Sequence, residues 1–222
     1  TDTKNIGFDF GMLSNKLTGS INYYINQTED LLITKRLSPS AGYQNPILNV
    51  GKIRNNGVEL EVNWTDKIKD FEYNVGFNFS TTKNKVVELA DKGQALPATG
   101  LLYDTDHIPA YAKEGKPISG FYLYRTDGIF QSDAEAEAWN AEHGTIVIVN
   151  GKEEWVGIQP NAKAGDIRFK DLDNNGVLDE DDKEYCGTGI PKFETNLNFS
   201  ASYKGFDLSF SLSGVFGHKI YN

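Results

Sequence analysis

Apolar and polar residues alternate along several stretches of the chain. In the segment 71–79, every odd position is apolar, and Glu72, Asn74, Gly76 and Asn78 lie between them. The same period of two recurs in segments 4–13, 16–27, 57–65, 191–203 and 206–217. Successive side chains of a β-strand point to opposite faces, so the pattern predicts six strands, each with one apolar and one polar face.

The connections between these segments alternate between short and long. Tight turns are predicted at Ser14-Asn15, from Asp66 to Asp70, and at Lys204-Gly205. Long connections run over 28–50 and 83–190. If the three turns lie at one end of an antiparallel sheet, both long connections lie at the other. Transmembrane β-barrels show this asymmetry, with short turns on one side of the membrane and long loops on the other.

The Asn56-Gly57 dipeptide allows two interpretations. It is a strong signal for a two-residue hairpin turn, which would pair 47–55 with 58–65. It is also compatible with a bulge inside one long strand, because the apolar phase slips between Ile53 and Val58. The bulge is favoured, because alternation before the dipeptide is poor.

The connection 83–190 contains signals of its own. Ser132 and Glu135 form the pattern of a capping box, and Gly144 follows as a C′ residue, which predicts a short helix over 133–143. Short strands are predicted at 121–124, 128–130 and 145–149. We expect this region to lie outside the membrane.

The composition excludes several classes of protein. The net charge is −9, from 22 Lys and Arg against 31 Asp and Glu, so nucleic-acid binding is not expected. The single cysteine, Cys186, rules out a framework of internal disulfides. No apolar run reaches the ~18 residues of a membrane helix, whereas a barrel strand needs only ~9–11 residues with every second one apolar.

An acidic loop at 171–182 has the spacing of a calcium-binding loop. Its candidate ligands, at positions 1, 3, 5, 7, 9 and 12, are Asp171, Asp173, Asn175, Val177 (through its carbonyl), Asp179 and Asp182. Gly176 supplies the sharp turn at position 6. Calcium takes ~6–8 oxygen ligands, so the sequence predicts a structural calcium site. Asp182 is shorter than the usual glutamate at position 12.

Other chemistry has weaker support. Glu59 and Glu61 lie on the same face of one strand and could act as an acid–base pair on a sugar, but two charges facing water explain them as well. Aromatic residues near strand ends suit the interfacial girdles of a barrel, as does ordinary strand propensity; they are Tyr23, Tyr24, Trp64, Phe71, Tyr73 and Tyr203.

The order of segments resembles the C-terminal half of the barrel in the SusC/RagA family of TonB-dependent outer-membrane transporters. Each segment is weak alone, but the ordered set covers nearly the whole chain. The segments that carry the resemblance are 5–10, 17–24, 28–32, 49–51, 56–60, 71–79, 84–86, 115–122, 126–130, 164–182, 189–193 and 203–221.

The resemblance implies an all-β, antiparallel transmembrane barrel of 22 strands, of which residues 1–222 supply about six spanning strands. It implies a non-enzymatic transporter in the cell outer membrane of a Gram-negative bacterium. It also implies an oligosaccharide or peptide substrate, a SusD-like surface lipoprotein, and coupling to TonB through a region outside these residues. We therefore expect the chain to be an internal fragment, with 83–190 as a large extracellular loop region.

A rival hypothesis is a secreted, calcium-dependent β-sandwich that binds carbohydrate. It would use the same acidic loop, and it would pack its apolar strand faces against each other in a core. A barrel would turn those faces outward, toward lipid. The location of the apolar faces therefore separates the two hypotheses.

Overall fold

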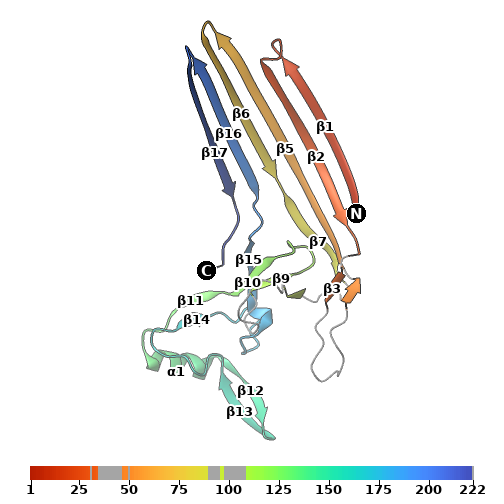
Figure 1. Cartoon of the computed structure of the whole chain (residues 1–222). Coiled ribbons are helices and arrows are strands. Elements are labelled where there is room, and N and C mark those ends of the chain that lie inside the picture. The colour runs from red at the N-terminus through yellow and green to blue at the C-terminus, as the bar shows by residue number, and fades with distance from the viewer. Residues whose placement is uncertain (31, 35–46, 50, 90–95, 98–108, 222) are drawn as a thin grey trace. The chain divides into compact units, whose positions relative to one another are not determined.

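The computed structural model describes residues 1–30, 32–34, 47–49, 51–89, 96–97 and 109–221 (Figure 1). The chain divides into two compact units, one formed by Thr1–Gly120 with Gly187–Asn222 and the other by Phe121–Cys186. The first unit contains the long alternating strands, and the second lies within the long connection 83–190. In the part of the chain that the structure describes, no helix is both long and apolar enough to cross a membrane.

The six strands predicted from alternation form one antiparallel sheet. Their order across the sheet is β1 (Asp2–Met12), β2 (Leu17–Thr28), β5 (Gly51–Ile68), β6 (Phe71–Thr81), β16 (Phe193–Tyr203) and β17 (Phe206–Phe216). A further strand, β7 (Lys83–Leu89), pairs with the first part of β5. The connection predicted over 83–190 therefore begins with a strand of this sheet.

Three tight connections join these strands in pairs at one end of the sheet, which we call the turn end (Figure 1). They span residues 13–16, 69–70 and 204–205. Lys204 and Gly205 both have positive φ, which matches the two-residue turn that suits the twist of a hairpin. The connection expected from Asp66 to Asp70 is shorter than predicted, because Asp66 remains paired with Tyr73 within the β5–β6 ladder.

Asn56-Gly57 lies inside the single strand β5, so the hairpin interpretation is wrong. The ladder to β2 continues through both residues, with Gly57 opposite Tyr24 and Asn56 opposite Ile25. The bulge is not at this dipeptide either, because the register with β7 shifts only between Lys52 and Ile53.

The slip in apolar phase has a different cause from a bulge. Ile53 lies on the same face of β5 as Glu59, which follows it six residues later, because side chains two residues apart share a face. Ile53 is buried, and it packs in a small apolar cluster with Val86, Leu89 and Ala112. The otherwise polar face of the sheet therefore becomes apolar locally, at the end away from the turns.

Two short strand pairs complete the first unit. They are β3 (Leu32–Thr34) with β4 (Ile47–Asn49), and β8 (Leu96–Pro97) with β9 (Ala110–Ala112).

The second unit contains one helix and several short strands. The elements, of which β10 and β15 extend by one and two residues into the first unit, are β10 (Gly120–Tyr124), β11 (Thr126–Ile129), α1 (Asp133–Glu142), β12 (Gly144–Val149), β13 (Lys152–Gly157), β14 (Ile167–Phe169), the 3-10 helix η2 (Glu180–Asp182) and β15 (Lys183–Thr188). β11 pairs with β14, β12 pairs with β13, and β10 neighbours β15. The helix and the three strands predicted in this region are confirmed.

The ends of α1 follow the capping prediction in part. The Ser132 side chain caps the helix by accepting a hydrogen bond of 3.1 Å from the backbone N–H of Glu135. The Glu135 carboxylate accepts from the N–H of Gln131, one residue before the cap. Gly144 has no positive φ and instead starts β12, because the chain enters that strand directly after His143.

Candidate functional site

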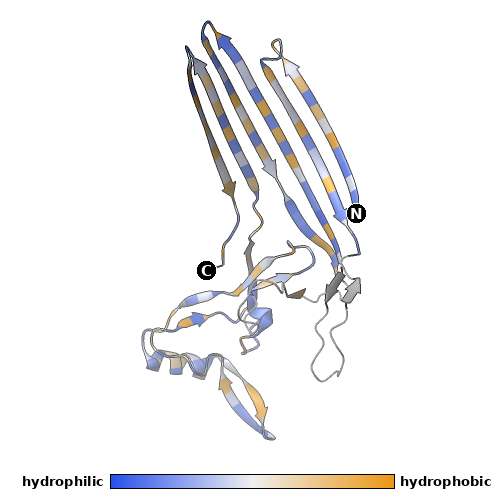
Figure 2. Cartoon of the chain, in the orientation of Figure 1, coloured by the Kyte–Doolittle hydropathy of each residue, from blue (hydrophilic) through white to orange (hydrophobic). Residues whose placement is uncertain are grey.

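The main sheet has one face that is apolar and exposed. Successive strands place apolar side chains opposite each other, as in the row Phe10, Gly19, Val62, Phe77, Leu197 and Leu212. Several members of this face are highly exposed, including Ile6 at 73%, Phe8 at 64% and Leu212 at 60%. Figure 2 shows the resulting alternation of hydrophobic and hydrophilic residues along the strands. In the described residues, no second sheet covers this face.

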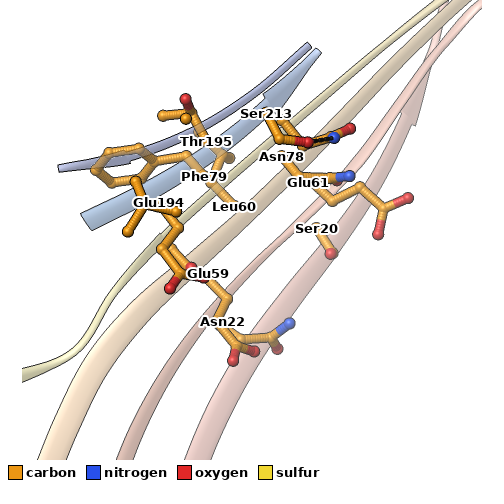
Figure 3. A pocket seen from close by; sticks show the side chains of 14 residues that line it. Ser20, Asn22, Glu59, Leu60, Glu61, Asn78, Phe79, Glu194, Thr195 and Ser213 are labelled. Carbon is orange, nitrogen blue, oxygen red and sulfur yellow. Dashed lines mark hydrogen bonds between the residues drawn. The ribbon is translucent and has the colours of Figure 1, made fainter. Parts of the chain in front are cut away.

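The opposite face of the same sheet is polar. The register aligns its residues in rows across all six strands, of which two are Asp9, Ser20, Glu61, Asn78, Asn196 and Ser213, and Gly7, Asn22, Glu59, Ser80, Glu194 and Val215. These rows border an open cavity of about 390 Å³ (Figure 3). Residues from six strands, several of them far apart in the sequence, therefore share one polar surface, which we call the polar wall.

Amides and hydroxyls on the polar wall bond to one another. The Asn63 amide donates to Glu61 at 2.9 Å, and the Asn196 amide donates to the hydroxyl of Ser213 at 2.9 Å. The Asn74 amide donates to the Thr65 hydroxyl at 2.7 Å. Each of these groups keeps further donor or acceptor capacity, because an amide has two N–H donors and a carbonyl with two lone pairs. The wall can therefore hydrogen-bond water or a hydroxyl-rich solute.

The charge of the polar wall is acidic away from the turn end. Asp9, Glu59, Glu61 and Glu194 lie in the two aligned rows, and none of them forms an ion pair within the described ranges. Asp9 and Glu194 were missed as partners of Glu59 and Glu61 in the sequence. The alternation marks each as polar, but only the strand order places Asp9 in the row of Glu61 and Glu194 in the row of Glu59, in each case with one serine between the two acids.

Aromatic residues of the apolar face gather near both ends of the sheet. Near the turn end, the Trp64 indole donates to the Tyr73 hydroxyl at 3.1 Å, and the Phe71 ring stacks on Tyr73 and lies 6.4 Å from Tyr203. At the other end, Phe193 lies 5.8 Å from Phe79 and 4.8 Å from Phe216.

The spacing of these two aromatic groups matches a membrane. From Phe193 to Tyr203 a strand extends ~33 Å, which at a tilt of ~40° corresponds to the ~25 Å apolar band of a barrel. Tyr23 and the other predicted girdle residues lie on the apolar face, with one exception. Tyr24 faces the polar wall, where its hydroxyl lies 2.9 Å from that of Thr82.

The acidic loop brings part of the predicted metal site together. Side-chain oxygens of Asp171, Asp173 and Asp182 lie within 4.8 Å of one another. The backbone N–H of Asn175 donates to both Asp171 and Asp173, and the side-chain amide of Asn175 donates to the Asp173 carboxylate at 3.0 Å. Asp179 is turned away to cap η2, where it accepts from the N–H of Asp181. The role of the Val177 carbonyl stays a prediction.

Asp182 is the feature of this loop that best fits a cation. Its side chain is fully buried, and its two oxygens accept from the N–H groups of Leu172 and Asp179 at 2.7 and 2.9 Å. Among the described residues no Lys or Arg pairs with it. Buried charges are normally paired or coordinate metals, so the donor set fits a hard divalent cation.

The two neighbouring carboxyls are shifted in opposite directions. Burial pushes the pKa of Asp171 upward, but hydrogen bonds from the N–H groups of Gly176 and Asn174 outweigh it and leave the pKa below its ordinary value. Burial, followed by the hydrogen bond with the carboxyl of Asp171, raises the pKa of Asp173. Carboxyls held this close resist ionising together, and a bound cation relieves that repulsion.

Comparison with protein families gives a match over nearly the whole chain. Residues 1–217 match the family described as "TonB dependent receptor-like, beta-barrel". Among curated relatives, TonB-dependent receptor P3 of Formosa agariphila is 29% identical over 219 residues, which is 98% of this chain and 20% of that protein. TonB-dependent receptor SusC of Bacteroides thetaiotaomicron is 24% identical over 227 residues, which is 100% of this chain and 20% of that protein.

Solved structures show the same fold. The RagAB peptide importer in its closed-closed state is 20% identical, with a TM-score of 0.66 over 97% of this chain and 21% of that chain. This chain therefore spans about a fifth of the length of the proteins it matches. The β-sandwich hypothesis is wrong, because the fold is that of barrel proteins and the apolar faces are not packed in a core. Catalysis by Glu59 and Glu61 gains no support, since the relatives are named as receptors.

Proposed function

Since the chain belongs to the TonB-dependent receptor-like β-barrel family, we propose that it forms part of the wall of an outer-membrane transporter for nutrients. The whole protein would sit in the outer membrane of a Gram-negative cell and draw energy through TonB. The chain spans about a fifth of its relatives, so the activity of the complete protein is part of the proposal.

One observation supports this function most directly. A single sheet separates an exposed apolar face from a polar wall over six strands that neighbour one another in the sheet. In hydrocarbon, every backbone N–H and C=O must be paired within the protein, and a closed sheet achieves this. The apolar face would then contact lipid, and the polar wall would line the passage through which the solute moves.

We propose oligosaccharides as the cargo, taken up together with a SusD-like surface lipoprotein. The polar wall offers amides, hydroxyls and carboxylates, and these groups hydrogen-bond to sugar hydroxyls. RagAB is named as a peptide transporter, so peptides are the competing cargo. The acids of the wall, Asp9, Glu59, Glu61 and Glu194, would repel anionic groups on either kind of solute.

The test uses the full-length transporter, expressed with its lipoprotein in a strain that lacks both. Uptake of a fluorescent oligosaccharide is compared with uptake of a fluorescent peptide. The double variant Asn78→Leu, Asn196→Leu removes amides from the polar wall, and Phe77→Leu, Leu197→Met changes the apolar face at neighbouring positions as a matched control. We expect oligosaccharide uptake to fall in the first variant alone.

The outcomes separate the parts of the proposal. Uptake of the peptide without uptake of the oligosaccharide would contradict the proposed cargo, and it would still support transport. Uptake that persists when TonB is deleted would overturn the energy coupling. Loss of surface expression in the leucine variant alone would be detected by immunofluorescence, and Asn78→Ser with Asn196→Ser would then replace it.

We also propose that the acidic loop binds calcium and thereby stiffens its part of the long connection. The buried Asp182 and the convergence of Asp171 and Asp173 support this assignment. Calcium would bind the remaining lone pairs of these carboxylate oxygens and hold the loop in one conformation. Nothing in the arrangement indicates a catalytic role for the metal.

Terbium luminescence and its displacement by calcium test the metal site in the full-length protein. Asp171→Asn and Asp173→Asn should each weaken binding strongly, since each removes a charged ligand. Asp181→Asn is the matched control, because Asp181 is exposed and lies outside the cluster. If all three variants bound terbium with the same affinity, the metal site would be excluded. That result would leave the proposed transport function untouched.

A further inference from the structure

The side chain of Tyr24, on the polar wall, lies along the sheet. Its hydroxyl is 2.9 Å from the hydroxyl of Thr82, and it donates to the carbonyl of Thr81 at 3.5 Å. Tyr24 belongs to β2, whereas Thr81 ends β6 and Thr82 follows it, on the other side of β5. Neighbouring strands are about 4.7–4.9 Å apart, so the phenol has to cross the width of β5 to reach these two threonines.

Gly57 allows the ring to lie across β5. It is the residue of β5 opposite Tyr24, and a Cβ built on it would lie 2.9 Å from Cζ of Tyr24 and 2.8 Å from the hydroxyl oxygen. A larger residue at this position would lift the phenol off the sheet. One side of the ring therefore rests on the backbone of β5, and the other side is turned to the space that the polar wall borders.

Hydrogen-bonding groups lie on both sides of this ring along the wall. Toward the turn end, the next row contains Asn22 and Glu59, which project to the same side of the sheet from neighbouring strands and border the open cavity (Figure 3). Away from the turn end, the next row contains Asn55, which accepts a hydrogen bond of 2.6 Å from the amide of Asn84. Rows on one face are about 7 Å apart, so a solute ring on Tyr24 would reach either row.

The wall is covered a short distance beyond Tyr24, away from the turn end. Ala112 of β9 packs in the same apolar cluster as Ile53, on the polar side of the sheet. The N–H of Ile118 donates to the side-chain oxygen of Asn84 at 2.8 Å and holds this covering segment against β7. Tyr24 therefore lies between the apolar cover and the acidic rows.

We propose that the Tyr24 ring is a binding subsite of the polar wall, on which one sugar ring of the cargo stacks. The inference rests on the proposed function and adds to it a residue that contacts the solute. A sugar ring has C–H groups on its faces and hydroxyls around its edge. The C–H groups pack against the electron-rich face of the aromatic ring, and the hydroxyls bond to Asn22 and Glu59 beside it.

A purely structural role for Tyr24 is the alternative, because an aromatic side chain that covers a glycine also stabilises a sheet. The two roles have different requirements. Covering Gly57 needs only an apolar side chain of sufficient size, whereas stacking needs an aromatic ring. Leucine at this position therefore keeps the cover and removes the stacking surface, and phenylalanine keeps both.

The experiment measures binding to the purified full-length transporter by isothermal titration calorimetry. The probes are three neutral oligosaccharides of different linkage, maltoheptaose, laminarihexaose and xylohexaose, and an uncharged octapeptide. We expect Tyr24→Leu and Tyr24→Ala to weaken binding of an oligosaccharide about tenfold, and Tyr24→Phe to stay within about twofold of the parent protein. Tyr23→Leu changes the neighbouring position on the apolar face and is the matched control, with unchanged affinity.

Three results would overturn the subsite. They are parent affinity in Tyr24→Leu, equal losses in Tyr24→Phe and Tyr24→Leu, which would assign the effect to the hydroxyl, and no binding of any of the three oligosaccharides by the parent protein. The uptake assay and its dependence on TonB test the proposed function separately, since transport of a peptide would survive all three. Urea unfolding in detergent confirms that each variant is folded.

Discussion

Single residues decide how closely the strands approach at the polar wall. A Cβ on Gly57 would lie 1.9 Å from the backbone carbonyl oxygen of Thr81 and 2.8 Å from the Tyr24 hydroxyl. A backbone oxygen in the middle of a sheet cannot move aside without disturbing the ladder. At Gly76 the nearest atom to a Cβ is the side-chain oxygen of Asn63, 2.8 Å away, and that side chain can rotate.

The two glycines therefore predict different outcomes for the same substitution. Gly57→Ala should lower the free energy of unfolding by about 1–3 kcal/mol through overpacking. Gly76→Ala should lower it by clearly less. Urea unfolding of the full-length protein in detergent, followed by tryptophan fluorescence, measures both. If Gly76→Ala lost as much stability as Gly57→Ala, the close approach of the Thr81 carbonyl would not be the cause.

Arg168 makes several contacts that hold elements of the second unit against each other. Its guanidinium donates to the Asp127 carbonyl at 2.7 Å and to the Glu135 carboxylate at 3.1 Å, and it lies over the Trp139 ring. Lysine cannot reproduce this fork of donors. Arg125, by contrast, forms an exposed pair with Glu184 at 3.5 Å.

Arg168→Lys should increase the rate of hydrogen exchange at the amides of α1, since about 1–3 kcal/mol of hydrogen bonding and packing is lost. Arg125→Lys serves as the control and should change little, because exposed ion pairs contribute ~0–1 kcal/mol. Exchange is followed by mass spectrometry on the full-length protein. Identical protection in both variants would show that Arg168 is not the organising residue.

At the scale of elements, each long strand has two faces with opposite requirements. Leu197 and Asn198 are neighbours in β16, and one lies on the apolar face while the other lies on the polar wall. Lysine at a lipid-facing position near the middle of a membrane costs ~2–4 kcal/mol, while a position on the lumen side tolerates it.

Leu197→Lys should therefore reduce the stability of the protein in lipid vesicles by about 2–4 kcal/mol. The stability of Asn198→Lys should stay close to that of the parent protein. Denaturant titration of vesicle-inserted protein provides the measurement. If Asn198→Lys were the more damaging substitution, the assignment of the two faces would be reversed.

At the scale of the whole molecule, the decisive property is where the apolar face points. A fluorophore at Phe77, Phe199 or Phe210 in the full-length protein should be quenched strongly by lipid-borne quenchers. The same label at Asn78, Ser200 or Ser209, on the polar wall, should be protected. Protection at all six positions would place the apolar face in a protein core and contradict the membrane-spanning wall.

The sequence by itself determined the strands and their faces, because the period of two follows from covalent geometry and shows in segments such as 71–79. It also predicted the Ser132 cap and the acidic loop, since capping and the Asp171–Asp182 spacing are local. Local signals failed at Asn56-Gly57, where pairing with β2 on one side and β7 on the other overrides the turn propensity of the dipeptide.

Only the tertiary structure decided which residues lie together across strands. Asp9, Glu61 and Asn196 meet on one wall because of strand order and register, which no short segment of sequence encodes. The burial of Asp182 is likewise a property of the assembled unit. The alternation of apolar and polar residues determines to which face of a strand a side chain points. Only the assembled fold determines which other residues that side chain contacts.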